Sequence, residues 1–316
     1  MGGGDDGIRR WQLSDGREVG KQTEMKLWAI ATSKDHKWVV CGTSNGASVW
    51  DGEMHERLIT VDRGGAAVTA VDISPDSTRF ATGTNKMSIW NINTGERLVG
   101  PLQHDDNVTG VKFSPNGEQI ATACYGASIR IFDGRNGDEL ITINTKMPYV
   151  TATTPLGWSS DGQRIFATSG DKKIRSFDVF TGSQLAELQI PSDGYYVHSL
   201  VLASNCKLIA TSADQSILFL DASTLTQTGP VIKDSEEIRS IAISQDNSYL
   251  ATGQVDGKIV IRKLSQILPD SYGPFHVRIC AFIVPACWTS PTLVNCVGIY
   301  SSGTTRRTTL SIGWPR

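Results

Sequence analysis

The sequence predicts an all-β fold built from repeated four-stranded sheets, and three observations support this. Related segments recur about every forty residues, which is typical of repeat architectures. Within each segment, apolar residues alternate with small or polar ones, the period of a half-buried strand. No window sustains a period of 3.6 residues, so helices are not expected. The length of 316 residues leaves room for about seven units of roughly 40–45 residues.

Each repeat has a tight turn, best written at Ser114-Pro115-Asn116-Gly117, between its first two strands. Proline sets the backbone of the second turn position, asparagine tolerates the third, and glycine closes the turn. The turn centres are Asp35, Asp76, Asn116, Asp161, Asn205 and Asp246, which are 41, 40, 45, 44 and 41 residues apart. This regular spacing defines six units.

The unit around Asn116 shows the predicted order of strands. Residues 108–114 form the first strand, 120–123 the second and 128–132 the third. A bend containing glycine then returns the chain for a fourth strand at 139–143. Because one such sheet cannot bury both of its faces, the units are expected to stack on one another.

These segments resemble the WD-repeat β-propeller family. The pair Trp50-Asp51 ends a third strand as it does in that family. Related pairs are Trp90-Asn91, Phe132-Asp133, Phe177-Asp178 and Leu220-Asp221, and the bend aspartates are Asp171, Asp214 and Asp256. The resemblance covers residues 8–264. It implies a β-propeller of seven blades, with six evident in the sequence and a seventh that is incomplete or formed from both termini.

The family pattern is incomplete in every unit. In the family, a His before the first strand, a Ser or Thr in the second, an Asp in the bend and the Trp of the third join in one hydrogen-bonded network. Here His104 fills the His position of one unit. Trp is replaced in three later units, by Phe177, Leu220 and Arg262. We therefore expect the blades to depend more on apolar stacking than on that network.

The two ends of the chain lie outside the six units. Residues 8–24 predict a third strand ending at Trp11, a turn and a fourth strand, so this blade lacks inner strands. Extended stretches at 275–285 and 293–300 either supply them or belong to a degenerate tail that packs poorly. The predicted domains are a flexible leader at 1–7, a propeller at 8–264 and an atypical tail at 265–316.

Composition excludes several classes of protein. The 30 Lys and Arg residues against 32 Asp and Glu give a net charge of −2, without the basic excess of a general nucleic-acid binder. The N-terminus has no apolar signal segment, and the longest apolar run, 279–288, is too short to span a membrane. Six scattered cysteines fit a reducing compartment. We expect a soluble cytoplasmic protein without membrane contact, and a nuclear location is left open.

The sequence lacks the spacings that catalysis or metal binding requires. It has no GxSxG, Walker-type or HExxH motif, and no GxGxxG that follows a strand. The five histidines fall in different units, which does not favour a shared metal site. We therefore predict no enzymatic activity, no cofactor and no metal.

In a propeller, binding residues are expected on the face that carries the fourth-to-first and second-to-third strand connections. The register places there the second residue of each first strand and the residue two positions earlier, and the bends between second and third strands add Tyr125. Several are Trp, Tyr or Arg, types enriched at interface hot spots. The candidates are Lys26, Trp28, Asn107, Tyr125, Tyr196, His198, Glu237 and Arg239. The alternative is that Trp28 and Tyr196 pack against adjacent blades.

The predicted function is a non-catalytic platform that binds other proteins or peptides on this face, as a monomeric propeller within a complex. The half blade at the N-terminus suggests a piece of a larger regulatory protein. The alternative is a propeller subunit that positions substrate for a multi-subunit enzyme.

Overall fold

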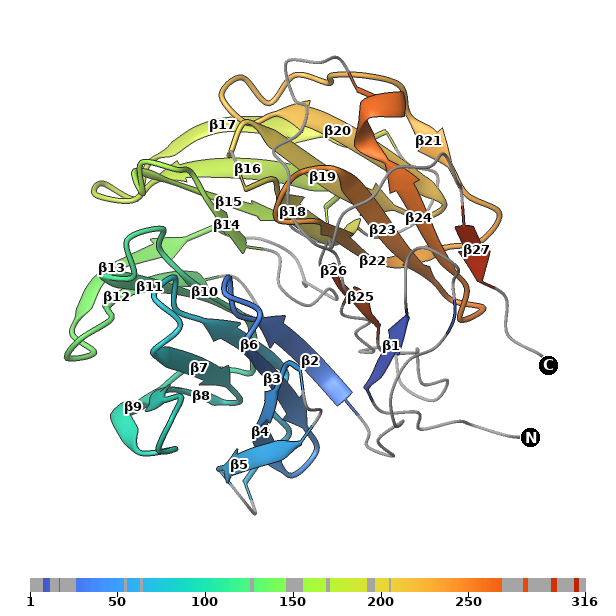
Figure 1. Cartoon of the computed structure of the whole chain (residues 1–316). Helices are drawn as coiled ribbons and strands as arrows, with labels where there is room; N and C mark the ends of the chain where they lie inside the picture. The colour runs from blue at the N-terminus through green and yellow to red at the C-terminus, as the bar shows by residue number, and fades with distance from the viewer. Residues whose placement is uncertain are drawn as a thin grey trace. The chain divides into compact units, whose positions relative to one another are not determined.

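The structure, a computed structural model, is all-β and consists of the antiparallel sheets of a β-propeller (Figure 1). It describes residues 8–11, 17, 27–53, 56–62, 65–125, 128–145, 156–168, 171–191, 197–204, 206–268, 281–283, 297–299 and 310–312. The chain divides into two compact units, one of residues 27–190 and one of residues 1–26 with 191–316.

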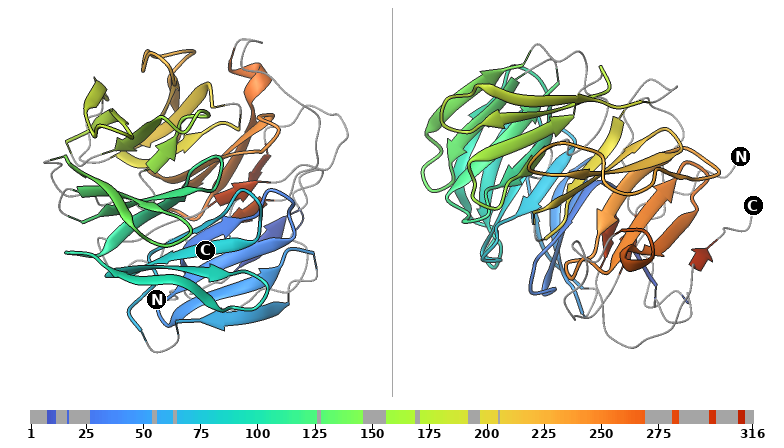
Figure 2. Two further views of the ribbon diagram at one scale, coloured as in Figure 1. Left: turned by 90° about the vertical axis from the view of Figure 1, so that its left-hand side faces the viewer. Right: turned by 90° about the horizontal axis from the view of Figure 1, so that it is seen from above.

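The unit of residues 27–190 contains four blades, A to D, each a four-stranded antiparallel sheet whose strands follow chain order (Figures 1 and 2). Blade A consists of β2 (Leu27–Thr32), β3 (Trp38–Thr43), β4 (Gly46–Asp51) and β5 (Arg57–Val61), and blade B of β6 (Ala70–Ile73), β7 (Arg79–Gly83), β8 (Lys86–Asn91) and β9 (Arg97–Gln103). Blade C consists of β10 (Val108–Phe113), β11 (Gln119–Cys124), β12 (Ser128–Asp133) and β13 (Glu139–Asn144), and blade D of β14 (Leu156–Trp158), β15 (Arg164–Thr168), β16 (Lys173–Asp178) and β17 (Gln184–Gln189).

The other unit contains blades E and F. Blade E consists of β18 (Val197–Leu202), β19 (Leu208–Ala213), β20 (Ser216–Asp221) and β21 (Ile232–Lys233). Blade F consists of β22 (Ile238–Ile243), β23 (Tyr249–Gln254), β24 (Ile259–Lys263) and β27 (Leu310–Ile312). A short 3-10 helix, Leu264–Gln266, follows β24, where the other blades turn toward a fourth strand. The fourth strand of blade F therefore comes from much later in the chain.

The expected seven-bladed propeller is not confirmed, because the described residues form six four-stranded blades. The terminal segments form a smaller sheet of three strands, β1 (Arg9–Trp11), β25 (Ala281–Ile283) and β26 (Val297–Ile299). Arg9 pairs with Ile283 in this sheet. Residues 1–7 and most of the predicted strands in 8–24, 275–285 and 293–300 lie outside the described residues.

The repeated turn forms as the sequence predicts. In blade C, Ser114 Oγ donates to Asn116 Oδ1 at 2.7 Å and accepts from the Gln119 amide at 2.9 Å, so one hydroxyl links both sides of the turn. Gly117 closes it with φ +71°. Where other blades lack glycine at this position, the residue is still held at positive φ. These residues are His36, Ser77, Cys206 and Asn247.

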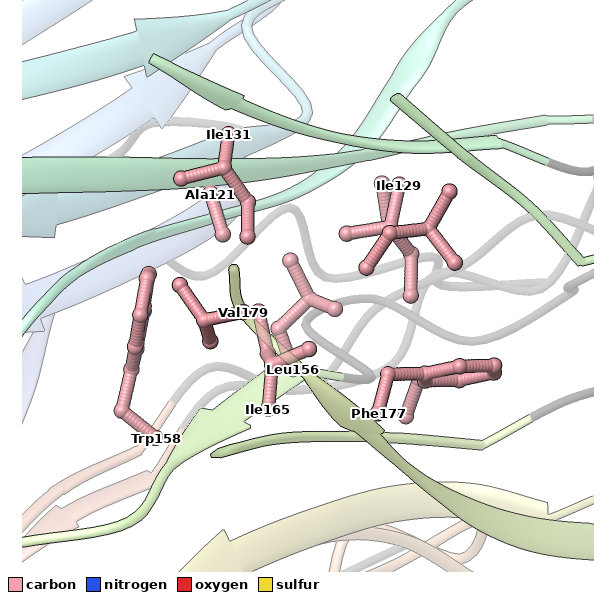
Figure 3. Close-up of a cluster of buried hydrophobic side chains, with 11 residues drawn as sticks. Ala121, Ile129, Ile131, Leu156, Trp158, Ile165, Phe177 and Val179 are labelled. Carbon is pink, nitrogen blue, oxygen red and sulfur yellow. The ribbon is translucent and has the colours of Figure 1, made fainter. Parts of the chain in front are cut away.

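Adjacent blades bury apolar side chains against one another. Between blades C and D, Ile129 and Ile131 of β12 lie against a group from blade D (Figure 3). That group includes Leu156, Trp158, Ile165 and Phe177. The indole Nε1 of Trp158 also donates to the Lys112 carbonyl of β10 at 3.0 Å. This stacking is the main source of stability for sheets that cannot fold alone.

Three blades keep part of the family's polar network, each with different residues. In blade B, Trp90 Nε1 donates to Thr82 Oγ1 at 2.9 Å. In blade C, His104 Nε2 lies 2.9 Å from Thr122 Oγ1, and its ring lies 5.6 Å from that of Phe132.

Blade F builds its network from charged residues. Asp234 stands four residues before β22, as His104 does before β10, and Arg262 stands in the Trp position of β24. Thr252 Oγ1 lies 3.2 Å both from Asp234 Oδ2 and from Arg262 Nη1, and the two charges pair directly. Apolar stacking is therefore supplemented by polar links in blades B, C and F, which the sequence reading underestimated.

Candidate interaction surface

A β-bulge recurs near the start of the first strand in four blades. In blade E, Val197 lies opposite Ala213 and Ser199 opposite Ser212, so His198 has no opposing residue. The same shift in the register leaves one unopposed residue in each of blades A, C and F. These residues are Trp28, Thr109 and Arg239. Bulges redirect side chains at sheet ends, which gives a structural basis for the candidates chosen by register.

Two of the bulges meet around one carboxylate in the unit of blades E and F. His198 Nε2 lies 2.7 Å from Glu237 Oε1, and Arg239 Nη2 donates to Glu237 Oε2 at 3.1 Å. The His198 side chain is 6% exposed, whereas those of Glu237 and Arg239 are each 34% exposed. We call these three residues the E–F cluster. In this cluster, the Glu237 carboxylate is held from two sides and part of its surface is open to solvent.

The E–F cluster holds His198 in its neutral form near pH 7. Burial lowers the pKa of His198, the Arg239 guanidinium lowers it further, and the carboxylates of Glu237 and Asp214 oppose this. A neutral imidazole that meets a carboxylate through Nε2 must carry its proton on that nitrogen. His198 therefore donates to Glu237, and the cluster has one positive and one negative charge.

The unit of residues 27–190 contains three more candidates, and the structure brings two of them together. The Tyr125 amide donates to the Asn107 carbonyl at 2.8 Å, which joins the bend after β11 to the residue that precedes β10. Asn107 is exposed and Tyr125 is half-buried. Trp28 is also half-buried, so its side chain combines packing with solvent contact. Lys26 and Tyr196 lie outside the described residues.

Sequence reasoning missed Gln254, which lies at the end of β23. Gln254 is opposite Ile238, the residue between Glu237 and Arg239. It is 1% exposed, and its side-chain nitrogen and oxygen have no hydrogen-bond partner among the described residues. The sequence does mark Gln254 as unusual, because the corresponding positions in other blades carry smaller side chains. These are Thr43, Cys124 and Ala213.

The described residues contain no group of three or more His, Cys, Asp or Glu side chains arranged to hold a metal ion. They also contain no helix long and apolar enough to cross a membrane.

Comparison with known proteins supports the repeat assignment. The family model "WD domain, G-beta repeat" matches residues 57–91, 97–133 and 223–262. Each match joins the fourth strand of one blade to the first three strands of the next, as in β5 followed by β6 to β8. The sequence repeat is thus offset by one strand from the structural blade.

Curated proteins are similar to parts of this chain. Autophagy-related protein 16 of Arabidopsis thaliana is 25% identical over 84% of this chain and 45% of its own length. WD repeat-containing protein 1 of Bos taurus is 27% identical over 71% of this chain and 31% of its own, and that of Gallus gallus 27% over 44% and 23%. The chain thus matches less than half the length of each of these relatives. With the six blades, these matches show that the chain carries repeats like those of the WD-repeat β-propeller family.

Proposed function

We propose that this chain is a non-catalytic interaction platform, whose partner is a protein or peptide held at the bulged ends of blades E and F. The observation that carries the proposal is the E–F cluster. Two successive blades bulge at the same register position, and both bulged side chains converge on Glu237. A rigid sheet scaffold that presents an ordered, partly exposed charged group is well suited to recognition.

The types of residue in the cluster support the same proposal. Arginine is enriched at binding hot spots, and a preordered guanidinium loses little freedom when it binds. Among the described residues, Arg239 makes one charged contact, with Glu237, so its other N–H groups can meet a partner. Similarity to WD-repeat propellers, which generally bind proteins, agrees with this proposal.

Affinity purification of the full chain tests the proposal. We expect Arg239→Ala to lose specific partners that the unchanged chain retains, at equal thermal stability. Arg135→Ala is a matched control, because Arg135 also pairs with a glutamate, Glu118, but on turns at the opposite strand ends of blade C. Equal loss of partners in both variants, or none in Arg239→Ala, would refute a role for the E–F cluster.

We also propose that the sheet of β1, β25 and β26 is a seventh blade with three strands. Within its unit, β26 lies against β22 and β23 of blade F, as neighbouring blades do. Amide hydrogen exchange tests this: slow exchange at Ala281–Ile283 and Val297–Ile299 is expected. Fast exchange at both strands would mean that no such blade forms.

The proposal includes a reducing, cytoplasmic setting and a monomeric propeller within a complex. Cys41 and Cys124 are buried free thiols, and burial raises the pKa of Cys124 to about 11. Such a thiol stays protonated and unreactive at neutral pH. Fluorescence microscopy of the tagged chain, with size-exclusion chromatography of the purified chain, tests both parts.

A further inference from the structure

The loops around the E–F cluster form one continuous surface. The Ile238 amide donates to the Asp214 carbonyl at 2.7 Å, and the Val255 amide donates to the Glu237 carbonyl at 3.0 Å. The Asp234 amide donates to the Gln215 carbonyl at 2.7 Å. Three segments, 213–215, 234–239 and 254–258, are therefore held side by side at one end of blades E and F.

This surface carries an excess of negative charge. Its three segments contain five acids, Asp214, Asp234, Glu236, Glu237 and Asp256, and two bases, Arg239 and Lys258. Arg262 of β24 neutralises Asp234, and His198 is neutral. Four acids then face two bases, an excess of two negative charges. Charge complementarity at an interface favours a partner of the opposite sign.

The remaining hydrogen-bonding capacity of Glu237 also favours a positively charged partner. Within the part of the chain that the structure describes, each Glu237 oxygen accepts one bond, from His198 or from Arg239, and each can accept another. The carboxylate is therefore fixed in place without being saturated. A cationic group can bind it at little cost in side-chain ordering.

Gln254 is a second, independent indication of a ligand. A buried amide whose oxygen and nitrogen are both unpaired is destabilising, and such groups in a folded protein call for an explanation. Gln254 starts the bend that joins β23 to β24, and its backbone pairs with Ile238 between Glu237 and Arg239. Its carboxamide oxygen is an acceptor that an ammonium or guanidinium group of a ligand would satisfy.

We propose that this surface recognises a lysine or arginine side chain on a protein partner. The cation contacts Glu237, with Glu236 and Asp256 supplying longer-range attraction and Gln254 a further acceptor. This inference rests on the proposed function and specifies the chemistry of its partner. The competing possibility is a partner carboxylate that binds the remaining N–H groups of Arg239.

Titration of the isotope-labelled full chain with two short peptides, followed by NMR, separates these possibilities. The probes are acetyl-Ala-Lys-Ala-amide and acetyl-Ala-Glu-Ala-amide, at physiological ionic strength so that diffuse attraction is screened. We expect the lysine peptide to produce saturable shifts in the amides of 213–215, 234–239 and 254–258. Glu237→Gln should weaken this binding by about tenfold.

Glu118→Gln is the matched control, because Glu118 is also paired with an arginine but lies in blade C. It should bind the lysine peptide as the unchanged chain does. Shifts in these loops with the glutamate peptide alone would overturn the inference. They would indicate a surface that binds a partner carboxylate through Arg239 instead. Shifts with neither peptide, or equal shifts in Glu237→Gln, would also overturn it, whereas the proposed function is judged separately by partner loss in Arg239→Ala.

Discussion

Arg262 and Asp234 form a buried ion pair at the two positions where the family pattern has Trp and His. Their side chains are 15% and 5% exposed, and both contact Thr252. Each residue alone looks like a loss from the repeat pattern. Together they form a charged network in place of the neutral one. The Thr252 hydroxyl that both residues contact corresponds to the Ser or Thr of the family network.

Removal of one partner of this pair should be costly. Asp234→Ala leaves Arg262 buried without its counter-charge, and the expected loss in free energy of unfolding is about 3–5 kcal/mol. Asp234→Ala combined with Arg262→Ala should cost less than the sum of the single variants, because no lone charge remains. Chemical denaturation of all three variants measures this coupling.

Asp105→Ala provides the matched control for the pair. Asp105 pairs with Arg130, but its side chain is 85% exposed. Its removal should cost less than about 1 kcal/mol, as for exposed ion pairs. Equal costs for Asp105→Ala and Asp234→Ala would contradict the assignment of a buried, structural pair.

Two turn glycines should differ in their tolerance of alanine. Both have positive φ, +70° at Gly162 and +83° at Gly137. An added Cβ at Gly162 meets nothing closer than 4.0 Å, whereas at Gly137 it would lie 2.5 Å from Val99 Cγ1. Gly162→Ala should therefore cost about 1–2 kcal/mol from backbone strain alone, and Gly137→Ala clearly more. Thermal unfolding that ranks them in the reverse order would contradict the packing of this turn on blade B.

The stability of the protein should fall as the pH drops below neutrality. Burial is the main cause that lowers the pKa of His104 from 6.5. The unfolded chain then binds more protons than the folded chain as pH falls through 6.5 toward the lowered value, so unfolding becomes more favourable. His104→Gln should reduce this slope when denaturation is measured at several pH values. A slope unchanged by the substitution would assign the effect to other groups.

Strand β27, the fourth strand of blade F, should protect the amides of the neighbouring β24 from hydrogen exchange. Val260 of β24 lies opposite Ser311. Proline at 311 disrupts an inserted strand, because it removes a backbone donor and fixes φ. Ser311→Pro should accelerate hydrogen exchange at Ile259–Ile261, and Ser311→Ala should leave it slow. If neither variant changes the exchange rate, β27 does not form the fourth strand of blade F.

The sequence was sufficient for most strands of the six repeats, but not for the fourth strand of blade F, β27, or for side-chain partners. The third strand expected at 128–132 is β12 (Ser128–Asp133), and the fourth expected at 139–143 is β13 (Glu139–Asn144), because turn chemistry and period determine both. Register also placed His198, Glu237 and Arg239 among the eight candidates for one face. Their shared carboxylate follows from rotamers that no one-dimensional pattern contains. Asp234 and Arg262 were missed because each departs from the family pattern and only the pair is complementary.

The most direct test of the interaction platform uses a photoreactive amino acid in place of Glu236, an exposed residue beside the E–F cluster. After irradiation in cells, this chain is predicted to form discrete covalent adducts with a protein. The same amino acid in place of Glu96, an exposed residue on a turn of blade B, serves as the control and should not form them. Adducts that are absent at 236, or identical at both positions, would contradict the claim that this end of blades E and F binds a partner.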